Sequence, residues 1–169
     1  MSKILKSFGM AALLVALLAG TGMAETTVIT GDVDPAISIT VPAAFTFTMS
    51  TIGENNAGKT LGVISNAACK VTVHEDSGDG VMESPTKGTL ANALVVDATD
   101  DGANTDGTPA GTAYKSVTLS GTAQDLFTCS QAVDLETTDM NIDFEQTTTY
   151  ADDAADDYTI TVTFTASNV

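Results

Sequence analysis

The sequence predicts an all-β protein, an Ig-like or jelly-roll β-sandwich of about nine or ten strands with Greek-key connections. Three observations indicate this class. Apolar residues and threonines alternate without interruption over residues 158–166, which is the period of a strand with one buried face. Threonine, whose branched β-carbon favours strands, is abundant along the chain. No segment after residue 24 carries a sustained helical stripe.

The first 24 residues have the pattern of a secretory signal peptide. Lys3 and Lys6 precede an apolar run at residues 10–18, and Gly22 and Ala24 supply the small residues that a signal peptidase reads. The apolar run is shorter than the roughly 20 residues that span a bilayer. We therefore expect residues 1–24 to be removed, and the mature protein to be secreted or displayed on the extracellular cell surface without membrane insertion.

Residues 25–34 form a strand-like N-terminal arm. Alternation gives this arm one face made of Thr27, Ile29, Gly31 and Val33. Because Pro35 cannot donate to a ladder, we expect the chain to turn or change register there. Two interpretations remain open. The arm is either an edge strand of its own domain or a strand inserted into a neighbouring subunit, as in donor-strand assembly.

Residues 35–169 have the length of a single β-sandwich domain. Regular alternation, as at residues 158–166, also occurs at residues 37–41, 45–49 and 69–73. Weaker strand candidates are residues 61–64, 90–96, 116–119, 126–129, 132–135 and 140–144. Stretches rich in Gly, Asp and Asn predict turns or surface loops at residues 53–58, 76–80 and 97–111.

Cys69 and Cys129 are the only cysteines of the chain, and we expect them to form a disulfide in an exported protein. The bridge would close a loop of about 60 residues, which the chain-entropy model values at roughly 4 kcal/mol. A metal or redox pair would need neighbouring ligands or a C-x-x-C spacing, and neither cysteine has them.

The charge balance limits the partners. After residue 24 the chain keeps all 22 acidic residues but only four of the six lysines, and it has no arginine, so the net charge changes from −16 to −18. Such a surface repels phosphate backbones and anionic lipids, which argues against nucleic-acid and membrane binding. We expect self-association or contact with other envelope proteins instead.

The acidic loop after residue 96 is the candidate metal site. Its oxygen ligands for Ca²⁺ would be Asp97, Asp100, Asp101, Asn104 and Asp106. The EF-hand pattern is incomplete, since Gly102 occupies the first ligand position and no glutamate closes the loop. A solvated loop without metal is the alternative, and no other cofactor is expected.

The sequence offers no pattern typical of a catalytic site. His74 is the only histidine, and it lies beside Glu75 and Asp76 at the end of a predicted strand. The chain has no Gly-rich phosphate loop and no zinc spacing, and with no Trp and three Tyr it offers little lining for a sugar cleft. We therefore expect a protein that is not an enzyme.

Several segments resemble small exported β-sandwich surface proteins of the WxL-like and archaeal envelope kind. The matching residues are 37–42, 65–67 leading into 71–73, 119–123, and 144–146 followed by 157–164. The Trp-x-Leu motif that names the WxL family is absent. In outline the chain also resembles chaperone-usher and other donor-strand pilins, which share an exported sandwich, one disulfide and an N-terminal arm. These resemblances carry over no catalytic residue.

The expected function is that of a non-catalytic extracellular structural subunit of a cell-surface layer or filament, assembled by donor-strand exchange through the N-terminal arm. The alternative is a secreted adhesin or a carbohydrate- or protein-binding module that uses the acidic loop at residues 97–111, with Ca²⁺ bound there.

Overall fold

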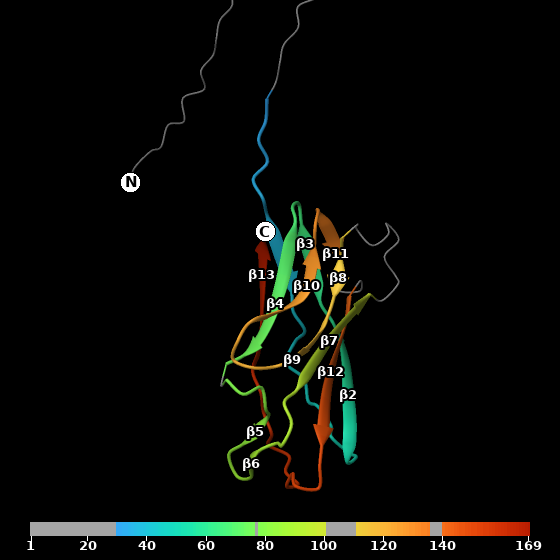
Figure 1. Cartoon of the computed structure of the whole chain (residues 1–169), viewed down its shortest axis with the longest axis vertical. Helices are drawn as coiled ribbons and strands as arrows, with labels where there is room; N and C mark the ends of the chain where they lie inside the picture. Colours follow the sequence, from blue (N-terminus) through green and yellow to red (C-terminus); the bar gives the residue numbers. More distant parts are fainter. Residues whose placement is uncertain (1–29, 77, 101–110, 136–139) are drawn as a thin grey trace, which may run out of the picture. The chain divides into compact units, whose positions relative to one another are not determined.

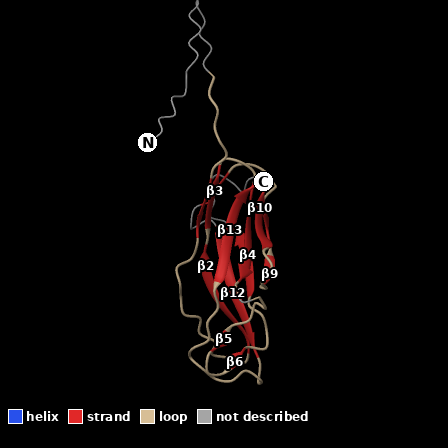
Figure 2. Cartoon of the chain, turned by 90° about the vertical axis from the view of Figure 1, so that its left-hand side faces the viewer, coloured by secondary structure: helices blue, strands red, loops and turns tan. Residues whose placement is uncertain are grey.

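The computed structural model describes residues 30–76, 78–100, 111–135 and 140–169. The chain divides into two compact units, Met1–Asp32 and Val33–Val169. Of the first unit only residues 30–32 are described, and they are exposed and lie outside any strand. In the second unit the described residues form strands and loops without a helix (Figure 2), and the paired strands are antiparallel. The all-β prediction is confirmed.

One four-stranded sheet is built around the strand that begins at the first cysteine (Figure 1). Its order is β13-β4-β10-β8, with bounds Val162–Asn168, Cys69–Glu75, Gln124–Cys129 and Ala113–Tyr114. In β4 every second side chain is buried, which follows the alternation of Cys69, Val71 and Val73 in the sequence. The period-two pattern therefore places β4 correctly, because one face of this strand is fully covered.

A second four-stranded sheet is built around the longest described strand, β12. Its order is β2-β12-β7-β9, with bounds Gly53–Thr60, Met140–Thr148, Val95–Asp100 and Ser116–Thr118. A smaller sheet has the order β1-β3-β11, with bounds Ile37–Thr40, Gly62–Ser65 and Val133–Leu135. Only Leu61 separates β2 from β3, so the small sheet begins where the edge strand of the larger one ends.

The sheets share one buried apolar cluster. Its members come from both four-stranded sheets and from β3, and they include Val63, Val71, Val96, Phe127, Ile142 and Phe144. The hairpin of β5 and β6, bounded by Glu83–Ser84 and Gly88–Thr89, forms a separate two-stranded sheet. Burial of this cluster is the main source of hydrophobic stabilisation in the described part of the domain, and Met82 and Leu90 are buried outside it.

A buried carboxylate holds the turn that follows β4. Glu75 is 3% exposed, and its Oε2 accepts hydrogen bonds from the backbone N–H groups of Gly78 at 2.7 Å and Gly80 at 3.0 Å. Gly80 has φ +75°, and a β-carbon there would overlap the backbone carbonyl of Leu119. Glycine is therefore required at this position by both its conformation and its packing.

Several predicted boundaries were wrong. The described chain contains thirteen strands rather than about nine or ten, because several are only two or three residues long. Residues 53–58, predicted as a turn, belong to β2, and residues 97–100, predicted as loop, belong to β7. Residues 45–49 are not a strand, and the strand predicted at 158–166 begins only at Val162. Whether each of these segments forms a strand depends on its pairing partner, which the sequence does not reveal.

Candidate functional site: an open groove at the sheet edges

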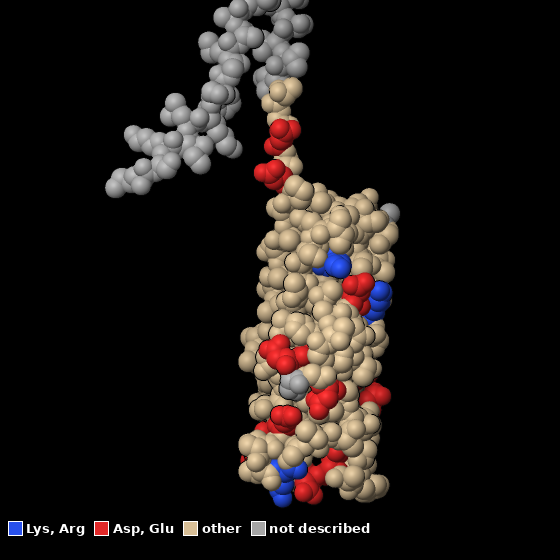
Figure 3. All heavy atoms as spheres, turned by 60° about the vertical axis from the view of Figure 1, so that its left-hand side comes forward, with Lys and Arg blue, Asp and Glu red and all other residues tan. Residues whose placement is uncertain are grey.

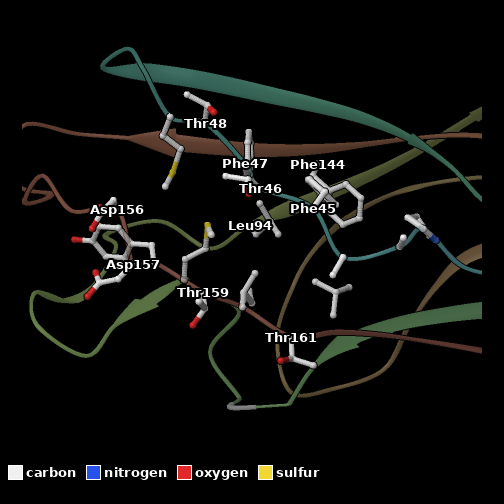
Figure 4. Close-up of a pocket in the computed structure, with 18 of the residues that line it drawn as sticks. Phe45, Thr46, Phe47, Thr48, Leu94, Phe144, Asp156, Asp157, Thr159 and Thr161 are labelled. Carbon is white, nitrogen blue, oxygen red and sulfur yellow. The ribbon is translucent and has the colours of Figure 1, made fainter.

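A groove with a volume of about 780 Å³ opens between two stretches of chain that are distant in sequence (Figure 4). Residues 41–49 form its first wall and residues 155–162 its second, and we call it the edge groove. The first wall connects β1 to β2, and the second leads into β13. Both β2 and β13 are edge strands of their sheets, so the groove lies at the open side of the domain.

The first wall has an unpaired backbone. Among the described residues, none forms a backbone hydrogen bond with residues 41–49, and the β1 ladder ends at the pair Thr40 and Gly62. Most of these residues are exposed, including Val41 at 48% and Phe45 at 37%. A segment whose N–H and C=O groups have no described backbone partner is a template on which a further strand can pair.

Side chains, rather than backbone bonds, hold this wall in place. The Phe45 ring packs on Phe144 of β12 with 5.2 Å between ring centroids, and the Lys59 Nζ lies 4.3 Å from the Phe45 centroid. Phe47 is half-buried against the apolar cluster. The Phe-Thr-Phe-Thr alternation therefore does orient alternate side chains inward, as the sequence predicts, although the ladder expected with it is missing.

The second wall is fastened to the β5–β6 hairpin. Glu83 and Thr159 exchange two backbone hydrogen bonds, of 2.9 Å and 2.8 Å. The Ser84 hydroxyl donates to the Asp157 carboxylate at 2.5 Å, and the Thr86 hydroxyl donates to its other oxygen at 3.1 Å. The hydrogen bond from Ser84 is the main cause of a lowered pKa at Asp157. This carboxylate therefore stays ionised and keeps the wall in place.

A second carboxylate closes the loop before this wall. Burial opposes ionisation of Asp152, but hydrogen bonds from the N–H groups of Thr149 at 2.6 Å and Ala91 at 2.7 Å outweigh it and lower the pKa of Asp152.

One end of the edge groove is acidic. Burial, and then repulsion by the nearby carboxylates, raises the pKa of Tyr158. Asp156 and Asp157 lie at one end of the edge groove, away from Phe45 and Phe144 (Figure 4). The groove thus combines an apolar floor with an acidic end.

The outer face of the β2-β12-β7 sheet carries an acidic cluster that the sequence reasoning missed. Asp143 of β12 lies directly opposite Asp97 of β7, and Glu145 is near both of them and near Glu54. Burial, followed by repulsion from these three carboxylates, raises the pKa of Glu145. The face in Figure 3 likewise shows acidic side chains spread widely and few lysines. Alternation over residues 140–144 marks Asp143 as outward-facing, but Glu54 and Asp97 lie in segments predicted as loops. Only the strand register shows that these residues are neighbours.

The predicted disulfide is confirmed. Cys69 and Cys129 are bonded, with 5.2 Å between their Cα atoms, and the two residues are direct partners in the ladder of β4 and β10. The bridge therefore links neighbouring strands of one sheet. Both cysteines are buried in the apolar cluster.

The predicted arm and calcium ligands are described only in part. Thr27 and Ile29 lie outside the described residues, while Gly31 and Val33 are exposed and lie outside any strand, with Val33 83% exposed. The calcium candidates that lie outside the described residues are Asp101, Asn104 and Asp106. Asp97 and Asp100 are on β7, three residues apart, so their side chains point to opposite faces of the sheet.

The described residues bring no catalytic constellation together. They contain no group of three or more His, Cys, Asp or Glu side chains that could hold a metal ion. The His74 Nε2 lies 3.5 Å from Asp76, and its Nδ1 is buried without a hydrogen-bond partner among the described residues. His74 thus has no described nucleophile within hydrogen-bond reach to activate.

Within the described part of the chain, no helix is long and apolar enough to cross a membrane. The described part of the domain has one further distinguishing feature, which is the edge groove and the wall whose backbone has no described partner. Comparisons with protein-family models, with curated proteins and with solved structures returned no match to this chain.

Proposed function

We propose that this protein is a non-catalytic extracellular structural subunit of a cell-surface layer or filament. In this proposal the domain is an Ig-like or jelly-roll β-sandwich, and its copies join by donor-strand exchange through the N-terminal arm. The observation that carries the proposal is that residues 41–49, at the open side of the sheets, form no backbone hydrogen bond with any described residue.

The composition of that wall supports assembly. Proteins that must stay monomeric blunt exposed edges with charges, proline or bulges. Residues 41–49 include no charged residue, and their one proline, Pro42, stands at the start of the segment. An edge left available in this way favours pairing with another chain by β-augmentation.

The compartment inferred from the sequence agrees with this role. The Cys69–Cys129 bridge is typical of oxidising environments outside the cytosol, and the pattern of residues 1–24 is typical of an exported chain. The excess of acidic residues keeps exported monomers soluble until a specific contact forms.

The test compares two forms of the mature protein, residues 25–169 and the same chain without residues 25–33. We expect filaments or sheets from the first form and monomers from the second, by negative-stain electron microscopy and light scattering. Tyr150→Ser, which removes a side chain that is 93% exposed and outside the edge groove, is the matched control and should assemble normally. Equal assembly with and without the arm would reject the proposal.

A further inference from the structure

We infer that the edge groove is the acceptor for the N-terminal arm of a second copy. The arm adds to residues 41–49 as a strand and directs Thr27, Ile29, Gly31 and Val33 into the groove. This inference rests on the proposed function, because it names the surface that the donor strand enters.

The form of the groove selects a strand as its occupant. One wall offers backbone donors and acceptors that have no partner in the described part of the chain, and the floor offers apolar surface at Leu94, Phe144 and Phe164. An added strand satisfies both features, since its backbone pairs with the wall while alternate side chains enter the groove. A helix would leave the wall's N–H and C=O groups unpaired, because its own backbone is already bonded internally.

The middle of the arm suits the wall in length and in charge. Residues 25–33 and 41–49 are segments of equal length, each about 30 Å when extended. Residues 26–31 of the arm and residues 41–49 contain no charged side chain, and the charges of the arm lie at its ends, at Glu25, Asp32 and Asp34. Repulsion between two such acidic molecules is therefore small along the wall, and the arm avoids the acidic end of the groove at Asp156 and Asp157 by placing its uncharged middle against Phe45 and Phe144.

The occupant comes from another copy because the arm leaves the domain at the N-terminal end of β1, whereas the groove begins at the C-terminal end of β1. The Asn66 Oδ1 accepts from the Ala36 N–H at 2.7 Å, the Asn66 Nδ2 donates to the Asp34 carbonyl at 3.0 Å, and the Asn66 N–H donates to the Ala36 carbonyl at 3.2 Å. These bonds hold residues 34–36 in line with β1, beyond the end of β3. The chain then runs through β1 before it reaches the groove, so the point where the arm begins and the groove are separated by the length of β1.

To fill its own groove, the arm would have to reverse at residues 34–36 and pass along β1 first. Insertion into a second copy needs no reversal. In such a contact the arm of one copy meets the groove of another, so each copy uses two different surfaces. Repeated contacts of this kind build open filaments.

The first test measures binding of a fluorescent peptide with the sequence of residues 25–33 to the intact mature protein. Ala43→Pro and Ala44→Pro each remove one N–H group from the wall, and adjacent N–H groups of an extended chain point to opposite sides. We expect one of the two variants to bind at least about tenfold more weakly and the other to bind normally, which corresponds to loss of a backbone hydrogen bond. Because residues 41–49 make no described backbone bonds, both variants should keep the melting temperature of the parent.

The peptide carries its own control. Ile29→Asp in the peptide places a charge on the inward face and should abolish binding, whereas Thr30→Asp places the same charge on the outward face and should not. Binding that is unaffected by both proline variants, or that is equally sensitive at the two peptide positions, would overturn the acceptor assignment.

The second test separates the acceptor from assembly itself. Copies carrying Thr30→Cys are mixed with copies carrying Thr46→Cys, because both side chains face away from the groove floor, and oxidation should join one copy of each kind. Copies with Tyr150→Cys in place of the groove variant are the control and should not be joined. Filaments that form without the groove cross-link would overturn the acceptor assignment and leave the proposed function standing. A protein that binds the peptide in the groove but never assembles would reject the filament and keep the acceptor.

Discussion

The Phe45 ring packs on Phe144 of β12 at a centroid distance of 5.2 Å and an interplanar angle of 56°. This contact ties to the sheet a wall that forms no backbone hydrogen bond with the described residues. Phe144 belongs to the apolar cluster, so the Phe45 side chain contributes both to the stability of the domain and to the shape of the edge groove.

Replacing Phe45 should therefore destabilise the domain more than its partial exposure suggests. We expect Phe45→Ala to lower the free energy of unfolding by about 1–2 kcal/mol, through lost burial and the lost aromatic pair, and Phe45→Leu by about half as much. Urea denaturation measures both. Ile52→Ala, at a side chain that is 55% exposed, is the control and should have little effect. Equal losses at the two positions would contradict this role for the pair.

Removal of the disulfide should have the largest effect of the changes considered. The loop between Cys69 and Cys129 spans 60 residues, so the chain-entropy model predicts that the double variant Cys69→Ser, Cys129→Ser loses about 4 kcal/mol. Urea denaturation with and without reductant measures this loss. Reductant should destabilise the parent and leave the double variant unchanged. A parent insensitive to reductant would show that the bridge contributes no stability.

The hydrogen bond from Ser84 to Asp157 makes the second wall sensitive to acid. The folded-state pKa of Asp157 is lower than its ordinary value of 3.8, so the ionised carboxylate stabilises the fold above that value. This stabilisation is lost as the pH falls through the lower, folded-state pKa. We expect Asp157→Asn to lower the melting temperature at neutral pH and to flatten its decline in acid. The exposed Asp153 offers the matched variant Asp153→Asn, which should melt like the parent.

Neutralising Glu145 should stabilise the protein. The folded-state pKa of Glu145 is above its ordinary value of 4.5, so the folded state binds this proton more tightly than the unfolded state does. The ionised group therefore costs stability at neutral pH. This cost declines as the pH falls through the folded-state pKa and is gone below the ordinary value of 4.5. We expect Glu145→Gln to gain about 0.5 kcal/mol, less at high ionic strength.

Thermal melts of Glu145→Gln at two salt concentrations test this prediction. Glu83→Gln is the control, because Glu83 lies on β5, outside the acidic cluster. A gain of the same size in both variants would point to the overall charge of the protein rather than to the neighbours of Glu145.

Sequence reasoning succeeded where a strand has one covered face. The alternation at residues 69–73 predicts β4 because Cys69, Val71 and Val73 are all buried. Only residues 162–166 of the 158–166 pattern lie in β13, where burial does not alternate. Sequence reasoning failed at β2, whose residues Gly-Glu-Asn-Asn-Ala-Gly-Lys-Thr have little preference for strands and are ordered by pairing with β12 along their whole length.

The groove could be predicted only in fragments. Alternation at residues 45–49 identifies which side chains face inward, but it carries no information about whether a partner strand exists. The Ser84–Asp157 contact joins residues 73 positions apart, and the carboxylates around Glu145 meet only through the register of three strands. Local pattern sets the direction of a side chain, while its neighbours depend on chain topology.

The order of the strands has a consequence for how the chain reaches its folded form. Each of the three larger sheets contains a strand from the last third of the sequence. This strand is β13 in the sheet around β4, β12 in the sheet that contains β2, and β11 in the three-stranded sheet. A nascent chain thus cannot complete any of these sheets until synthesis is nearly finished, and pairings so distant in sequence form slowly. The sheets therefore remain incomplete during most of synthesis, and this incompletely folded state is the one that the export step of the proposed function would require.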